Sequence, residues 1–209
     1  MSKKTVILIV VLVVIMPLTV WNVSQFLSRQ PTFPPELQGI LWPEPKPLRD
    51  FTLVNQHKQP FNLQHLEGKW TLMFFGYTYC PDICPTSMLV LKTVYEHLQQ
   101  KLGVGFNLQI VFVSVDPARD TTSVLLDYLG YFSKDFIGVT GTTENIDGLT
   151  RQIGAGYMQQ PADKTGNYQV NHTGTFFLID PQARLYAGFP QPHIPKTIVG
   201  QFLQIRSIW

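Results

Sequence analysis

Residues 70–88 read WTLMFFGYTYCPDICPTSM, and this stretch decides the fold that the sequence predicts. Trp70–Phe75 is a continuous apolar run of strand length, which is typical of a central strand covered on both faces. After it the chain turns sharply and enters a helix, with Cys80 and Cys84 at the turn and Pro81 at the first helical position. The stretch therefore predicts a reactive pair of thiols at a strand-to-helix turn.

Cys80 and Cys84 are the only two cysteines in the chain, and they stand four residues apart. If both lie on the first helical turn, their sulfurs face the same side, with Cβ atoms ~5–6 Å apart. A relaxed disulfide needs Cβ atoms ~3.5–4.5 Å apart, so it requires local distortion or Cys80 placed just before the helix. One soft metal ion bridging two thiolates requires neither, and both interpretations remain open at this point.

Strand and helix patterns alternate along the rest of the domain. Leu108–Val115 (LQIVFVSV) is a second buried strand, and apolar residues at helical spacing follow each of the two buried strands. Further strands are expected at Phe51–Val54, Pro60–Leu63, Phe136–Thr140, Tyr168–Val170, Thr175–Asp180 and Leu185–Phe189, with a last helix after Pro195. This order predicts an α/β domain with helices on both faces of a sheet, and a site at the carboxyl ends of strands, where the cysteines lie.

Composition limits the function classes. The chain has 209 residues, of which 44% are hydrophobic, so it can bury a core. Its formal net charge is only +2, without long runs of one charge, and this argues against nucleic acid as a partner.

The N-terminal region predicts a membrane anchor. Thr5–Trp21 contains no charged residue and follows Lys3 and Lys4. The run is longer than the ~7–15 apolar residues of a signal peptide and lacks an Ala-x-Ala-like cleavage site, so a retained anchor is favoured over a cleaved peptide. The basic residues place the N-terminus in the cytoplasm and the rest of the chain on the periplasmic or extracytoplasmic side of the inner membrane.

The predicted organisation has four parts. Residues 1–4 are the cytoplasmic N-terminus, 5–27 the single-pass anchor, 28–47 a proline-rich tether and 48–209 the α/β domain. Export places the cysteine pair in a compartment that tends to oxidise thiols.

A third ligand for a metal at the cysteines has to come from another residue type, and histidine is the first choice. His172 directly precedes an apolar strand segment, and its position alone leaves it open whether it is a ligand or a hydrogen-bonded structural residue. The other four histidines are expected at the surface: His57, His65, His97 and His193. Soft sulfur ligands select Cu(I) and imidazole also suits copper, whereas structural zinc needs four protein ligands.

Three aspartates lie near the predicted site. Asp82, between the cysteines, is expected to place its charge at the helix N-terminus, with direct metal contact as the alternative. Asp116 and Asp120 follow a strand end and are expected to build a turn and a helix start near the mouth of the site, with Thr121 or Asp120 as the helix cap.

Four segments resemble the Sco/SenC family of thioredoxin-like copper proteins: FFGYTYCPDICPTSM, VFVSVDPARDT, FIGVTGT and VNHTGTFFLIDP. The resemblance covers the chain from about Leu41 to its C-terminus. It implies a thioredoxin-like fold and copper, as Cu(I) and also Cu(II), bound by Cys80, Cys84 and His172. It further implies copper delivery to, or thiol reduction at, the dinuclear copper site of cytochrome c oxidase subunit II, with a separate copper donor or thiol reductant.

The sequence departs from the family pattern at two positions. Tyr79 stands where His is common before the first cysteine, and Asn171 stands where Asp is common before the distal histidine. Neither change removes a ligand. Asp82, Asp116 and Asn171 are expected to surround the ligands and tune them.

Three functions remain open from the sequence. The first is a membrane-anchored copper metallochaperone, which is not an enzyme in the ordinary sense. The second is a periplasmic thiol-disulfide oxidoreductase or redox sensor that uses a Cys80–Cys84 disulfide, although three residues separate the cysteines instead of the usual two. The third, a peroxide-reducing enzyme, needs one activated thiolate and a resolving thiol.

Overall fold

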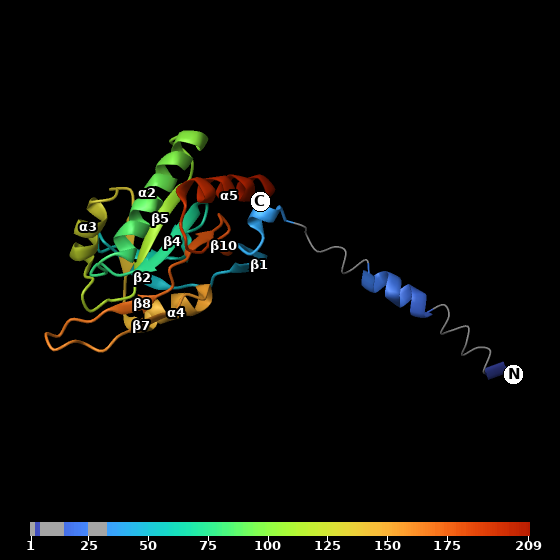
Figure 1. Ribbon diagram of the computed structural model, residues 1–209, viewed down its shortest axis with the longest axis horizontal. Helices are drawn as coiled ribbons and strands as arrows, with labels where there is room; N and C mark the ends of the chain where they lie inside the picture. The colour runs from blue at the N-terminus through green and yellow to red at the C-terminus, as the bar shows by residue number, and fades with distance from the viewer. Residues whose placement is uncertain (1–2, 5–14, 25–32) are drawn as a thin grey trace. The chain divides into compact units, whose positions relative to one another are not determined.

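A computed structural model describes residues 3–4, 15–24 and 33–209 of the chain (Figure 1). The chain divides into two compact units, Met1–Glu36 and Leu37–Trp209. In the first unit, residues 15–24 are helical. Within the described ranges no helix combines the length and the apolarity needed to cross a membrane. Residues 5–14 and 25–27 of the predicted anchor lie outside those ranges, so the anchor stays a prediction.

The second unit is built on an eight-stranded mixed sheet in the order β1-β10-β9-β4-β5-β6-β2-β3. Only the β4–β5 and β5–β6 pairs are parallel, and the other pairs are antiparallel. The strands are β1 (Leu41–Pro47), β2 (Thr52–Asn55), β3 (Pro60–Asn62), β4 (Trp70–Gly76), β5 (Leu108–Ser114), β6 (Ile137–Thr140), β9 (Phe176–Ile179) and β10 (Arg184–Phe189). A separate antiparallel hairpin pairs β7 (Tyr157–Gln159) with β8 (Val170–His172).

Helices cover both faces of this sheet. In Figure 1, α2 (Ile83–Leu102), α3 (Thr122–Gly130) and α5 (Pro195–Ile208) lie on one side, and α4 (Thr143–Ile153) lies on the other. Two short 3₁₀ turns, η1 (Pro35–Leu37) and η2 (Leu63–His65), complete the elements. The predicted α/β domain with a mixed central sheet is confirmed.

The two long apolar runs of the sequence form the two central strands, β4 and β5. Every residue of β4 and of β5 is buried, because each strand has neighbours on both edges and side chains packed on both faces. The carboxyl ends of these two parallel strands, at Gly76 and Ser114, lie side by side. The loop that carries the cysteines leaves from this edge, where the sequence placed the site.

The predicted tether is wrong in its second half. Residues 41–47 form β1, an edge strand that pairs with β10 across a bulge. Leu37 is completely buried, so the domain begins well before residue 48. The three prolines of β1 favoured the prediction of a tether. Proline is nevertheless tolerated in an edge strand, because no second neighbouring strand needs its missing N–H.

One predicted helix start needs correction. Helix α2 begins at Ile83 and not at Pro81, which lies in a bend before it. Helix α3 is capped by Thr121, one of the two predicted caps, whose hydroxyl accepts a hydrogen bond from the Val124 N–H at 3.3 Å; the other candidate, Asp120, has another role described below.

Candidate metal centre

Cys80 and Cys84 lie on opposite sides of a helix start. Cys80 belongs to the bend that follows β4 and is half-buried, whereas Cys84 is the second residue of α2 and is completely buried. The backbone N–H of Cys84 donates a hydrogen bond to the Cys80 Sγ at 3.3 Å. The sequence had named this arrangement, Cys80 just before the helix, as one of two ways to bring the sulfurs together. Both thiols are free.

His172 reaches the cysteines from the other side, at the end of β8. Its Nε2 lies 3.2 Å from the Cys84 Sγ, and its Nδ1 lies 3.2 Å from the Thr173 carbonyl oxygen. A hydrogen bond between Nδ1 and that carbonyl orients Nε2 toward the cysteines. The rings of Phe74 and Tyr77 hold the imidazole edge-on, at centroid distances of 5.7 and 6.1 Å.

The three predicted ligands therefore converge. One ligand atom from each of Cys80, Cys84 and His172 lies within 4.8 Å of the other two. These residues are separated by up to 92 positions in the chain, and the β7–β8 hairpin brings the histidine to the cysteines. Two sulfurs and one imidazole nitrogen at this spacing can hold one soft metal ion.

The two thiols share one proton unequally. The Cys84 thiol donates to the Cys80 sulfur, and with help from His172 and nearby backbone N–H groups this lowers the Cys80 pKa to about 3. The same hydrogen bond, together with burial, raises the Cys84 pKa far above its usual range. At neutral pH the metal-free pair is thus a thiolate at Cys80 and a thiol at Cys84.

Access to the site is from the side of Cys80 and His172. A hollow of about 360 Å³ opens beside them, and the buried Cys84 is not one of the residues that line it. It is lined by Tyr77, Cys80, Pro81, Asp82, Ile83, Gln169, Val170, Asn171, His172, Gly174 and Gln191. A metal ion or another thiol would reach the half-exposed ligands first.

Gly76, at the end of β4, makes room for the Cys84 sulfur. A Cβ atom at this position would lie 3.0 Å from the Cys84 Sγ and 2.8 Å from the Phe112 Cε2. Both distances are shorter than ordinary van der Waals contact. The absence of a side chain at residue 76 is therefore part of the site, and the sequence analysis missed it.

The acidic residues divide into different roles. Asp82 is exposed on the rim of the hollow and caps no backbone N–H with its side chain. Asp120 is fully buried and accepts hydrogen bonds from the Thr78 N–H at 3.0 Å and from the Thr78 and Ser114 hydroxyls at 2.6 Å each. It ties the cysteine loop to β5, and burial raises its pKa. Asn171 lines the hollow and is exposed.

Comparison with known proteins gives the family. A model of the SCO1/SenC family matches residues 43–205. The chain belongs to the SCO1/SenC family. An SCO2-like protein of Rickettsia felis is 36% identical over 156 residues, which cover 74% of each chain.

Solved structures of Sco proteins have the same fold. The structure of Arabidopsis thaliana ScoI with copper bound matches with a TM-score of 0.72 and 27% identity, covering 77% of this chain and 98% of that one. Yeast Sco1 with copper bound matches with a TM-score of 0.72 and 30% identity, covering 79% and 91%. The thioredoxin-like fold and the family that the motifs predicted are confirmed.

None of the other four histidines of this SCO1/SenC-family chain, all of which the structure describes, belongs to the cluster of ligand atoms. His57, His65 and His97 are exposed, as predicted. His193 was also predicted at the surface, but it is half-buried and stacks on Phe176 with a centroid distance of 3.6 Å. Burial lowers its pKa, and its Nε2 lies 3.1 Å from the Phe189 carbonyl oxygen, so it is a packed and hydrogen-bonded part of the loop after β10.

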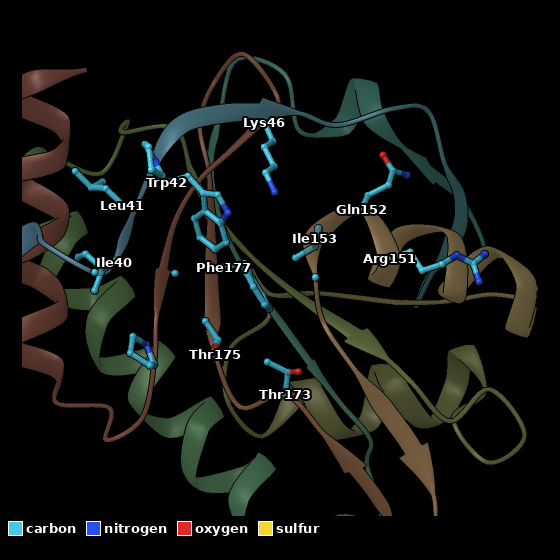
Figure 2. A pocket seen from close by; sticks show the side chains of 15 residues that line it. Ile40, Leu41, Trp42, Lys46, Arg151, Gln152, Ile153, Thr173, Thr175 and Phe177 are labelled. Atoms are coloured by element: carbon cyan, nitrogen blue, oxygen red, sulfur yellow. The ribbon is translucent and has the colours of Figure 1, made fainter. Parts of the chain in front are cut away.

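A second hollow lies elsewhere in the SCO1/SenC domain, between β1, β9 and the end of α4 (Figure 2). Its volume is about 480 Å³, and Trp42 and Phe177 form an aromatic pair in its wall, with centroids 6.4 Å apart. Lys46 and Thr173 also line it. None of its described lining residues is a cysteine or histidine.

Proposed function

We propose that this SCO1/SenC-family protein is a copper metallochaperone that binds one Cu(I) ion through Cys80, Cys84 and His172. The observation that carries the proposal is the convergence of these three ligand atoms within 4.8 Å. Its support is chemical, because two sulfurs and an imidazole suit Cu(I). The copper bound in the Arabidopsis ScoI and yeast Sco1 structures supports the same choice of metal.

Copper is the cargo of this site, and the thiols are arranged to receive it. Cys80 is already a thiolate at neutral pH, whereas Cys84 carries the shared proton. Bridging of the two sulfurs by Cu(I) displaces that proton, so binding releases one proton from the pair. His172 provides the third ligand atom of the site.

The unequal burial of the ligands sets the direction of transfer. Cys80 and His172 face the hollow, and Cys84 anchors the ion from within the core. Incoming client thiolates can replace the two half-exposed ligands before Cys84 dissociates from the copper ion. The client we propose is the dinuclear copper site of cytochrome c oxidase subunit II, to which this protein delivers copper or whose cysteines it reduces. A separate copper donor or thiol reductant would in turn serve this protein.

We further propose that the domain works outside the cytoplasm, held to the inner membrane by residues 5–27. Support comes from the uncharged run Thr5–Trp21 behind Lys3 and Lys4. Cellular fractionation and protease protection of a tagged full-length chain test this. Release of the domain in soluble form, or protection from external protease in spheroplasts, would contradict it.

The copper proposal is tested on the full-length chain in detergent. Anaerobic titration against a chromophoric Cu(I) chelator should give about one copper per chain. Cys80→Ser and Cys84→Ser should abolish tight binding, and His172→Ala should weaken it, while His97→Ala on the exposed face of α2 is the matched control and should bind as the wild type does. A wild-type chain that retains no copper would overturn the proposal.

Thiol-disulfide exchange is the second candidate function, favoured by one observation: a half-exposed thiolate beside a buried thiol. The Cys80 thiolate would attack a client disulfide, forming a mixed disulfide and releasing one client thiolate. Cys84 would then form the Cys80–Cys84 disulfide and release the second thiolate, so two electrons pass to the client. Reduction of a model disulfide without copper, undiminished in His172→Ala, would support this function.

A further inference from the structure

Arg119 is not one of the proposed metal ligands, yet it lies in a cluster of aromatic rings beside the metal centre. Its guanidinium carbon lies 3.6 Å from the ring centroid of Tyr168, 4.9 Å from that of Tyr79 and 5.6 Å from that of Tyr77. All three distances are within the ~6 Å range of cation–π attraction. The side chain is 19% exposed, so the attraction acts in a mostly desolvated place.

Hydrogen bonds fix the arginine on one side only. Its Nε donates to the Asp116 carboxylate, and its Nη1 donates to the Tyr168 carbonyl oxygen at 3.0 Å. The Tyr168 hydroxyl donates to the other oxygen of Asp116 at 2.8 Å, which closes a ring of three residues. The remaining nitrogen, Nη2, is buried and has no hydrogen-bond partner among the described residues. The Asp116 carboxylate and the surrounding aromatic rings together compensate the charge of the guanidinium.

Each of the three tyrosines leads to a metal ligand. Tyr79 is bonded to Cys80 in the chain, and Tyr77 packs its ring edge-on against His172. Tyr168 stands two residues before β8, the strand that ends at His172. Arg119 therefore contacts the loop that carries one ligand and the hairpin that carries another.

We propose that Arg119 is a positioning residue that clamps the cysteine loop to the β7–β8 hairpin and thereby sets the distance between Cys80 and His172. Asp116 anchors the clamp to the end of β5, because its backbone N–H donates a hydrogen bond to the Ser114 hydroxyl oxygen at 3.1 Å. Tyr79, the residue that departs from the family pattern, provides one aromatic face of the clamp. This inference rests on the proposed copper function, and it adds a reason for Tyr79 in this chain.

Arg119→Lys is the substitution that tests the clamp. Lysine keeps the positive charge but lacks the planar group that stacks on rings and bonds two partners at once. Partners that orient metal ligands typically contribute 10–100-fold to metal affinity, so we expect Cu(I) affinity to fall by at least about tenfold.

Arg184→Lys is the matched control. Arg184 also pairs with a buried aspartate, Asp180, at 2.6 Å, and it lies at the start of β10. Its substitution alters an equivalent arginine–aspartate pair elsewhere in the domain. Cu(I) affinity of Arg184→Lys should stay within about twofold of the wild type.

A double-mutant cycle separates positioning from general destabilisation. If Arg119 acts through His172, then adding His172→Ala to Arg119→Lys should cost much less than His172→Ala costs in the wild type. Independent effects would multiply, and such multiplication would overturn the proposal. An affinity of Arg119→Lys equal to that of Arg184→Lys would overturn it as well.

A metal-free measurement keeps the inference separate from the copper function. The amides of Gln160 and Thr173 are bonded across the β7–β8 hairpin, to Gln169 at 2.7 Å and Gly156 at 2.8 Å. Their hydrogen exchange in the copper-free chain should be faster in Arg119→Lys and unchanged in Arg184→Lys; unchanged exchange in both would refute the clamp. If the wild type did not bind copper, the proposed function would be refuted, but the hydrogen-exchange measurement would still test the clamp.

A second variant serves if Arg119→Lys does not fold. Tyr79 is 60% exposed, so Tyr79→Leu removes one face of the clamp without opening the core. We expect Cu(I) affinity to fall several-fold and the two hairpin amides to exchange faster. Wild-type affinity and exchange in this variant would overturn the role of Tyr79 and of the clamp.

Discussion

Substitution of Gly76 by alanine tests how tightly the buried ligand is placed. The backbone of Gly76 is not in the left-handed region, so alanine can adopt it and the effect comes from contact alone. The new methyl group would lie 2.8 Å from the Phe112 ring and 3.0 Å from the Cys84 sulfur. Real Cβ contacts are longer, so Cys84, Phe112 or the strand end must move by several tenths of an ångström.

The size of the effect follows from the packing of the core. Phe112 and Cys84 are both completely buried and cannot shift toward solvent. Overpacking in such a site typically costs about 1–3 kcal/mol. For a domain of this size each kcal/mol corresponds to about 2–4 °C, so the midpoint of thermal unfolding should fall by about 2–12 °C. Cu(I) affinity should fall by about tenfold, because one sulfur leaves its position.

Gly148→Ala is the matched control for this experiment. Gly148 lies inside α4, and a Cβ atom there would meet no described heavy atom within 4 Å. Alanine should therefore stabilise the helix by about 0.5–1 kcal/mol and leave copper binding unchanged. Circular dichroism melts and competition titrations with Cu(I) measure both quantities. If Gly76→Ala melts and binds copper as the wild type does, the account of the Cys84 pocket is wrong.

Three further predictions concern the thiols and the loop that carries them. Iodoacetamide should alkylate Cys80 rapidly even at pH 5, because the lowered pKa keeps it a thiolate until the pH falls toward about 3; mass spectrometry should find Cys84 unmodified, and Cys84→Ala, which removes the main stabilising hydrogen bond, should slow the reaction at pH 5. If the alkylation rate of Cys80 falls away as the pH is lowered below about 8, the result would contradict the lowered pKa. Cu(I) binding at pH 8 should release about one proton per copper, measured by pH-stat titration, and release of none would show that Cys84 is not a thiol in the free protein. Asp120→Asn should destabilise the domain by about 1–3 kcal/mol in chemical denaturation, because an amide cannot accept all three hydrogen bonds that reach the carboxylate; an unchanged midpoint would remove Asp120 from the support of the loop.

The part of the fold that the sequence predicted is the part with strong local pattern. Trp70–Phe75 and Leu108–Val115 are apolar without interruption, and such runs become central strands because both faces need cover. Strand β1 was missed because its pairing with β10 is decided by partners 137–146 positions away and not by its own composition. Local pattern does not reveal which edge a proline-rich segment will join.

The residues of the site also divide into those with a local sequence signal and those without one. The cysteine pair was visible because its spacing is local, and His172 was selected by its place before a strand and by resemblance. Arg119 and its three tyrosines carry no such signal, since their contacts join residues up to 49 positions apart and depend on the loop geometry. The DPARDT segment was noted, but its arginine was not assigned a role.

X-ray absorption spectroscopy of the Cu(I)-loaded full-length chain tests the central claim most directly. The account predicts two sulfur scatterers and one imidazole nitrogen around each copper, with the imidazole contribution absent in His172→Ala. A copper bound by sulfur alone in the wild type, or a wild-type spectrum identical to that of His172→Ala, would contradict a centre made by Cys80, Cys84 and His172.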